Sequence, residues 1–249
     1  MQAAPPPLNV ATLRDAILGL EGTVLEDFEL PLPGDLKDIS KAAALVSGTI
    51  EERVPELLNR VRSTTWDPAQ VYIAYEWRKS PIGFPDVLLV ERANPENVIF
   101  EVEAKSWYVL STDALTARFL TEPNAITPGT LVILVAWLLD GVVSGSPKLL
   151  RIHVDEAARL AQVRDDRWTT NRPDRRIVRP VNPPGTPRSQ FSTQVRGEFL
   201  RNGQWQAEAQ NFGKLDRLGD AALQQFRNDT LNLKAAGKTY AEWRGFITA

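Results

Sequence analysis

The sequence predicts an α/β protein in which helices flank a mixed central β-sheet. The main observation is that the hydrophobic pattern changes from helical spacing to short extended segments, then alternates between the two. A second observation is size and composition: 249 residues, 43% hydrophobic and 24% charged, suffice for one main domain with an appended segment.

The amino-terminal part of the chain is expected to be helical. Residues 9–20 place apolar side chains at helical spacing, and Asn9 is suited to cap the helix. A longer helical region runs from residue 35 to residue 62. Gly48 and Pro55 are expected to break or bend it.

The extended segments follow this helical part. Residues typical of strands, bounded by turns, predict strands at Gln70–Trp77, Asp86–Glu91, Asn97–Lys105, Leu131–Trp137 and Lys148–Val154. Helices are expected at Thr112–Leu120, at Asp155–Val163 with Asp155 as the cap, at Leu215–Leu233 and at Thr239–Ile247. Residues 169–190 contain five prolines and predict no regular element.

The composition excludes several kinds of site. The chain has no cysteine, which excludes disulfides, thiolate nucleophiles and cysteine-based metal sites. We interpret the single histidine, His153, as a strand residue with a satisfied hydrogen bond, which disfavours a Ser-His-Asp triad. The proline-rich start shows no signal-peptide pattern, and the longest apolar run is too short to cross a bilayer. We therefore expect a cytoplasmic protein without a membrane partner.

Charge is distributed unevenly along the chain. Residues 1–150 carry 12 basic and 20 acidic side chains, whereas residues 151–249 carry 17 basic and 11 acidic ones. The basic excess includes a run from Arg164 to Arg201 that contains no lysine. Arginine suits phosphate oxygens and guanine edges, so the run indicates DNA binding. A solvated loop in a chain poor in lysine is the alternative.

Three residues on two neighbouring predicted strands suit phosphodiester hydrolysis. Asp86 opens one strand, and Glu103 lies near the end of the next, so both carboxylates can meet at one end of the sheet. Mg²⁺ prefers such hard oxygen ligands. Lys105 projects to the same face as Glu103 and could hold the attacking water or neutralise the phosphate. Glu101 shares this face, and we interpret it as a bystander.

The pattern Pro85-Asp86 followed by Glu103-Ala104-Lys105 resembles the signature of the PD-(D/E)xK nuclease superfamily, which includes most restriction endonucleases. The resemblance covers roughly residues 48–154 and implies a restriction-endonuclease-like core. In that family a helix often supplies a further acidic residue; Glu52 is expected in that role, with Glu51 as the weaker candidate. We expect residues 1–165 to form the nuclease core. Residues 166–249 are expected to form an Arg/Pro-rich loop and a C-terminal helical segment, packed on the core and contacting DNA.

The resulting hypothesis is a Mg²⁺-dependent DNA endonuclease (a phosphodiester hydrolase), most closely a type II restriction enzyme acting as a homodimer on double-stranded DNA. Its catalytic residues would be Asp86, Glu103, Lys105 and Glu52, with Asp86 and Glu103 as metal ligands. The expected DNA-binding residues are Arg164, Arg167, Arg172, Arg175, Arg176, Arg179 and Arg188. Two alternatives stay open: a repair, recombination or phage-defence nuclease of the same fold, and a non-catalytic nucleic-acid-binding protein.

Overall fold

The computed structural model describes residues 5–26, 39–111, 117–187 and 190–248. Its helices are α1 (Val10–Leu18), α2 (Ile39–Arg60), α3 (Ala157–Thr169), α4 (Ala221–Asn232) and α5 (Tyr240–Thr248), with short 3₁₀ turns at Arg62–Thr64, Pro123–Ala125 and Leu215–Arg217. Its strands are β1 (Tyr75–Lys79), β2 (Val87–Glu91), β3 (Asn94–Tyr108), β4 (Leu131–Leu139), β5 (Pro147–Glu156), β6 (Arg175–Val178), β7 (Arg196–Arg201), β8 (Gln204–Ala207), β9 (Lys234–Ala235) and β10 (Lys238–Thr239). None of the described helices is long and apolar enough to cross a membrane.

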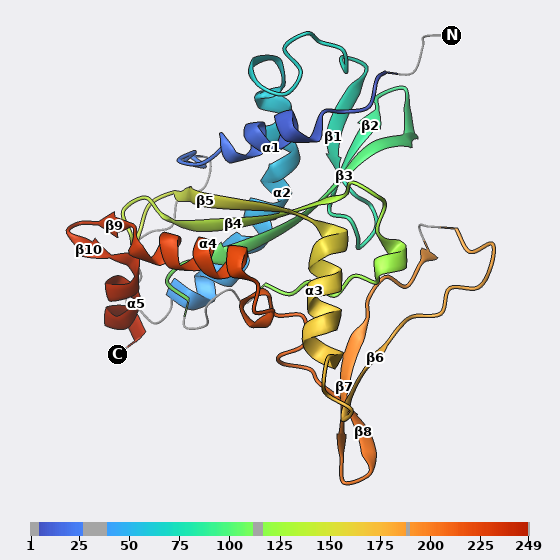
Figure 1. Cartoon of the computed structure of the whole chain (residues 1–249). Coiled ribbons are helices and arrows are strands. Elements are labelled where there is room, and N and C mark those ends of the chain that lie inside the picture. Colours follow the sequence, from blue (N-terminus) through green and yellow to red (C-terminus); the bar gives the residue numbers. More distant parts are fainter. Residues whose placement is uncertain (1–4, 27–38, 112–116, 188–189, 249) are drawn as a thin grey trace.

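Five strands form one mixed sheet in the order β1-β2-β3-β4-β5, at the centre of Figure 1. β1, β2 and β3 are successive antiparallel neighbours, β4 runs parallel to β3, and β5 is antiparallel to β4. The parallel pair needs a crossover connection, which residues 109–130 provide. The predicted α/β class with a mixed central sheet flanked by helices is confirmed.

Helices cover both faces of this sheet. The hydroxyl of Ser106 in β3 donates to the backbone oxygen of Ser47 in α2. The ring of the next residue, Trp107, packs 6.3 Å from the ring of Phe226 in α4. Because successive strand residues point to opposite faces, α2 and α4 lie on opposite sides of the sheet. Figure 1 shows α1 above the sheet and α4 below it.

The sheet forms the centre of the hydrophobic core. Every residue of β4 is buried, as its uninterrupted apolar run predicts for an interior strand. Trp77, Trp107 and Trp137, from three different strands, are each at most 2% exposed. The C-terminal helices contribute to the same core, through Phe226 of α4 and Tyr240 of α5.

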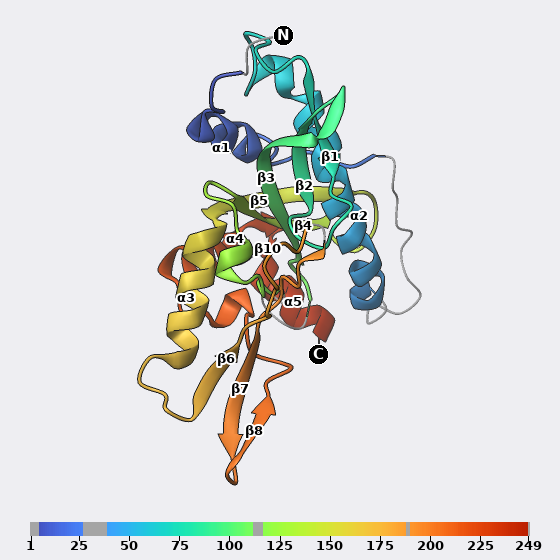
Figure 2. The ribbon, with the colours of Figure 1, turned by 90° about the vertical axis from the view of Figure 1, so that its right-hand side faces the viewer.

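A second sheet, made of β6, β7 and β8, projects away from the main sheet beside α3 (Figures 1 and 2). Its inner face packs on Trp168 and Phe212, whose ring centroids lie 5.3 Å apart. Gly197 is required there, because a Cβ would lie 2.5 Å from the Phe212 ring. Asn202 and Gly203 connect β7 to β8, both with positive φ, which matches a tight two-residue hairpin turn.

α2 is one helix rather than two. Gly48 and Pro55 were expected to break or bend this region; the break is absent, because α2 is a single helix of 22 residues with Pro55 inside it. Ile50 and Leu57 are at most 3% exposed and belong to the main core. This burial outweighs the one backbone hydrogen bond that proline removes, because tertiary packing supplies most of the stability of a helix in a protein.

Three other segments also differ from prediction. Residues 70–74 form turns, and the strand begins only at Tyr75. Residues 117–120 are extended rather than helical, and Phe119 donates its backbone N–H to Gly213; residues 112–116 of that expected helix lie outside the described residues. Residues 169–190 include β6, which forms because it pairs with β7, a partner distant in sequence.

Helix boundaries follow local hydrogen bonding. Asn9 caps α1 as predicted, because its side chain accepts the N–H groups of two residues in the first turn. α3 starts at Ala157, and Asp155 accepts hydrogen bonds from Arg159 instead of capping it. The expected helix at 215–233 is interrupted at Gly219, which has a φ of +72°, and α4 then begins behind Asp220 as its cap.

Candidate active site

The candidate site lies where β2 ends and leaves one edge of β3 without a partner strand. The first residue of β2 pairs with Val102, so the later residues of β3 have a neighbouring strand, β4, on one side only. On the open side, the backbone N–H of Ala104 donates to Oδ2 of Asp86 at 3.0 Å. The N–H of Ser106 donates to Oε1 of Glu51, also at 3.0 Å. Two carboxylates thus replace a neighbouring strand as hydrogen-bond acceptors.

Lys105 places a positive charge among these carboxylates. Its Nζ lies 2.5 Å from Oε1 of Glu103 and 3.4 Å from Oδ2 of Asp86. It also donates to the backbone oxygen of Ala104 at 3.1 Å. Asp86 and Glu103 therefore converge on one ammonium group instead of pointing to opposite sides of the sheet. We refer to Glu51, Asp86, Glu103 and Lys105 as the carboxylate–lysine cluster.

The cluster is mostly shielded from solvent but open at Asp86. The side chains of Glu103, Lys105 and Asp86 are 6%, 19% and 32% exposed. Burial raises the pKa of Glu103 to about 8, against the attraction of Lys105. Burial also raises the pKa of Glu51. Burial lowers the pKa of Lys105, but the surrounding carboxylates outweigh it and the net pKa is raised. Perturbed ionisable groups gathered in this way are typical of catalytic sites.

The donor set of the cluster suits a hard divalent cation. Oε2 of Glu103 is buried and has no hydrogen-bond partner, although buried carboxylate oxygens normally have one. Asp86 and Glu103 supply two carboxylates, a number that Mg²⁺ commonly takes beside water and phosphate oxygens. Among the described residues, no group of three or more Asp, Glu, His or Cys side chains is placed to bind a metal ion. The fit therefore rests on these two carboxylates.

The acidic residue that α2 contributes to the cluster is Glu51 rather than Glu52. Oε1 of Glu52 lies 2.5 Å from Nζ of Lys79, and both of these side chains are more than half exposed. Glu51 instead bonds the backbone N–H and the hydroxyl of Ser106. Glu52, which was expected in the catalytic role, therefore lies outside the carboxylate–lysine cluster, and Glu51, the weaker candidate, lies within it.

Glu101 and His153, which the sequence analysis considered as functional candidates, are not part of the cluster. The carboxylate of Glu101 accepts hydrogen bonds from the hydroxyls of Thr127 at 3.1 Å and Thr130 at 2.9 Å, in keeping with its interpretation as a bystander. His153 lies in β5, and its Nε2 is 3.3 Å from Oδ2 of Asp155. The histidine is thus a strand residue with a polar partner, as predicted.

Two of the arginines expected to bind DNA are engaged by the protein itself. Arg164 is 1% exposed and donates to the backbone oxygen of Thr121 at 2.8 Å, so the expectation that it contacts DNA is wrong. Arg179 lies between Glu122 at 2.8 Å and Asp165 at 2.6 Å. Its charge is already matched by two carboxylates, which makes it an unsuitable phosphate ligand.

Three other arginines from the same prediction come together in space. Arg167, Arg172 and Arg175 line a cavity of about 490 Å³ with Arg217, which the sequence did not single out. The guanidinium of Arg175 lies 4.2 Å from the ring centroid of Trp168, a cation–π distance. Glu208 and Asp216 also line it, so this arginine cavity has four guanidinium groups against two carboxylates, and the excess positive charge suits an anionic ligand.

The last two arginines predicted to bind DNA, Arg176 and Arg188, do not line the arginine cavity in the described part of the chain. Arg176 bonds Glu198 at 2.7 Å, and its guanidinium lies 4.4 Å from the ring centroid of Trp205. Arg188 lies outside the described residues. Among the arginines predicted to contact DNA, the remaining candidates are Arg167, Arg172 and Arg175 in the arginine cavity and Arg176 in the β6–β8 sheet.

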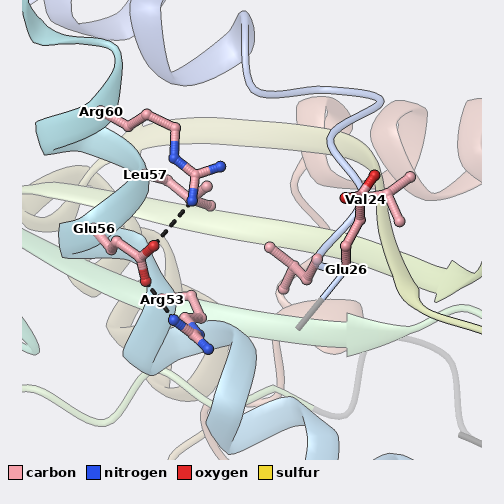
Figure 3. A pocket seen from close by; sticks show the side chains of 7 residues that line it. Val24, Glu26, Arg53, Glu56, Leu57 and Arg60 are labelled. Atoms are coloured by element: carbon pink, nitrogen blue, oxygen red, sulfur yellow. Dashed lines mark hydrogen bonds and ion pairs between the residues drawn. The ribbon is translucent and has the colours of Figure 1, made fainter. Parts of the chain in front are cut away.

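A separate cavity of about 370 Å³ lies beside α2 (Figure 3). Among its lining residues, Glu56 lies between Arg53 at 2.5 Å and Arg60 at 2.9 Å, so the carboxylate is matched by two cations. No residue of the carboxylate–lysine cluster lines this cavity. We assign no function to it.

Compared with known proteins, the chain matches no family model, no curated protein and no solved structure. The functional assignment therefore rests on the geometry of its own residues.

Proposed function

We propose that the chain is a Mg²⁺-dependent endonuclease of the PD-(D/E)xK type that hydrolyses phosphodiester bonds in double-stranded DNA. The observation that carries the proposal is the convergence of Asp86 and Glu103 on Lys105 at the open edge of β3. The residue types and their mutual distances fit a centre that hydrolyses phosphodiesters with the help of a divalent cation.

The order of the strands supports the same proposal. Three antiparallel strands followed by β4 parallel to β3 are similar to the restriction-endonuclease-like core that the sequence motif implies. One departure exists, since the described part of residues 109–130 forms no α-helix before β4. We therefore base the proposed activity on the cluster and treat the core architecture as secondary support.

The roles of the four residues follow from their positions. Asp86 and Glu103 would hold the cation, which supplies counter-charge to phosphate oxygens and lowers the pKa of a bound water. Lys105 would orient the attacking water or offset the charge that develops on the phosphate. Glu51 fixes the backbone of Ser106, the residue after Lys105, and so positions the lysine.

Substrate binding would fall to the basic part of the chain. An acidic amino-terminal part with an excess of eight acidic residues repels DNA, whereas the remainder has an excess of six basic ones. Within it, Arg167, Arg172 and Arg175 of the arginine cavity would bind the phosphate backbone.

The proposal also includes a homodimer. Cutting both strands of a duplex needs two cuts, and a homodimer supplies one centre per subunit.

Incubating the purified chain with mixed plasmid DNA, with Mg²⁺ or with a chelator, tests the proposal. Discrete fragments that appear only with Mg²⁺ support a restriction enzyme. A smear or nicks at branched structures support a repair, recombination or phage-defence nuclease with the same centre. Retention of DNA without any cleavage in Mg²⁺ or Mn²⁺ would contradict the nuclease and support the non-catalytic alternative.

A further inference from the structure

The β7–β8 hairpin is the part of the chain that projects furthest beyond α3 (Figures 1 and 2). All four residues of β8 are exposed, as are the last two residues of β7. The exposed positions include Leu200 and Trp205, which are 41% and 37% exposed. The end of the hairpin therefore presents side chains of both faces to solvent.

The strand register sorts the hairpin residues onto two faces. Arg201 pairs with Gln204, Phe199 pairs with Gln206, and Arg175 of β6 pairs with Phe199. Since paired residues share a face and alternate residues do too, Arg201, Gln204 and Gln206 lie on the face of Arg175. Arg175 also lines the arginine cavity. One continuous face therefore runs from the cavity to the hairpin tip.

The charge of this region suits nucleic acid. Residues 172–208 contain seven arginines, three acidic residues and no lysine, a net charge of +4. Of the acidic residues, Glu198 is buried between Arg176 at 2.7 Å and Arg196 at 2.9 Å, so it does not oppose an approaching phosphate. The face with Arg201 carries amide and guanidinium groups that can hydrogen-bond base edges.

We propose that the β7–β8 hairpin enters a groove of duplex DNA and reads its sequence through Arg201, Gln204 and Gln206. The major groove admits a two-stranded β-ribbon, and arginine and glutamine form paired hydrogen bonds with guanine and adenine respectively. The arginine cavity holds the adjoining phosphates and sets the register of the hairpin on the duplex. The inference rests on the proposed function in taking DNA as the ligand.

The hairpin is connected to the carboxylate–lysine cluster through a short path. Val195, which precedes β7, donates its backbone N–H to the oxygen of Leu120 at 2.8 Å. The neighbouring Phe119 packs its ring 6.3 Å from that of Phe84. Phe84 lies two residues before Asp86. The base of the hairpin is thus linked, through residues 119 and 120, to the loop that carries Asp86.

A selection from a randomised DNA duplex pool tests the inference. The full chain and its Arg201→Ala/Gln204→Ala variant are each incubated with the pool in chelator, and the retained duplexes are sequenced. Leu200→Ala is the control, because it shortens an exposed side chain on the opposite face of the same strand and removes no charge. Melting curves should coincide for all three proteins, since the changed side chains are exposed.

The wild type and the control are expected to enrich one shared motif. The double variant is expected to lose at least one position of that motif and to bind the enriched duplex about tenfold more weakly. Equal motif and affinity in the double variant, or no enriched motif with wild type, would overturn the inference. The selection needs no cleavage. If the chain binds DNA through the hairpin but never cuts it, only the proposed nuclease activity is contradicted. If the double variant cuts and binds DNA as the wild type does, only the proposed role of the hairpin in reading sequence is contradicted.

Discussion

Asp86 accepts a hydrogen bond from the backbone N–H of Ala104, the residue that separates Glu103 from Lys105. This bond holds the end of the 80–86 loop against the open edge of β3. The same carboxylate also faces Nζ of Lys105 at 3.4 Å. Asp86 thus has a structural hydrogen bond as well as a proposed chemical role. A useful substitution keeps the hydrogen bond to Ala104 and removes the negative charge.

Glu51 and Glu52 are adjacent in sequence and should behave differently. Glu51→Gln keeps an oxygen that can accept the Ser106 N–H but loses the charge next to Lys105, so DNA cleavage should fall by about tenfold or more. Glu52→Gln removes only an exposed pair with Lys79 and should leave the rate unchanged. Initial rates on supercoiled plasmid give the comparison. A larger loss for Glu52→Gln than for Glu51→Gln would exclude Glu51 from the centre.

Without bound metal, the protein should become less stable as the pH rises. Burial raises the pKa of Glu103 from 4.5 to about 8 and raises that of Glu51. Between those values the folded chain holds protons that the unfolded chain has released, so the free energy of unfolding falls with pH and levels off above about 8. The raised pKa of Lys105 does not offset this, because its contribution is fully present below 10.5. Urea denaturation in chelator at about pH 6 and about pH 9 measures the fall.

Two controls belong to this pH measurement. Glu103→Gln removes the titrating group and should flatten the decrease, by no more than about 1.4 kcal/mol for each pKa unit of the shift. Saturating Mg²⁺ should stabilise the wild type more at high than at low pH, because a cation binds the deprotonated carboxylate. The same slope in wild type and Glu103→Gln would show that the buried carboxyl does not titrate as described.

Arg164 should matter for stability rather than for DNA binding. Its guanidinium is buried and bonds Asp165 at 2.8 Å and the backbone oxygens of residues 119 and 121. Arg164→Ala leaves these groups without their partner and is expected to cost about 3 to 5 kcal/mol of unfolding free energy. Arg172→Ala changes a residue that lines the arginine cavity, and it should leave stability unchanged and weaken DNA binding. Denaturation curves and fluorescence anisotropy distinguish the two effects, and reversed behaviour would contradict the burial-based assignment.

The sequence was sufficient to predict the strands that carry the cluster, because their apolar patterns are strong and local. The choice between Glu51 and Glu52 was also accessible from sequence. Val46, Ile50 and Val54 recur at helical spacing and define the buried face of α2, beside which Glu51 lies and away from which Glu52 points. The resemblance to the nuclease superfamily favoured Glu52, whereas the hydrophobic stripe of α2 favours Glu51.

The β6–β8 sheet was predicted less well, for a physical reason. β6 pairs with β7 about twenty residues further along the chain, and such a pairing leaves no periodic trace in a four-residue strand. The β7–β8 turn did leave a local trace, since Asn202-Gly203 is a strong signal for a two-residue hairpin. The arginine cavity needed the structure itself, because Arg217 joins the others only through the packing of the 3₁₀ turn at Leu215–Arg217 near α3.

Cleavage by Asp86→Asn is the measurement that separates the structural bond of this residue from its proposed chemistry. The asparagine oxygen can still accept the Ala104 N–H, so the variant should fold and melt as the wild type does. It lacks the negative charge that a cation requires, so plasmid cleavage in Mg²⁺ should fall by about a hundredfold or more. Equal cleavage rates for wild type and Asp86→Asn, with the same melting temperature, would contradict the metal-dependent nuclease proposed for this chain.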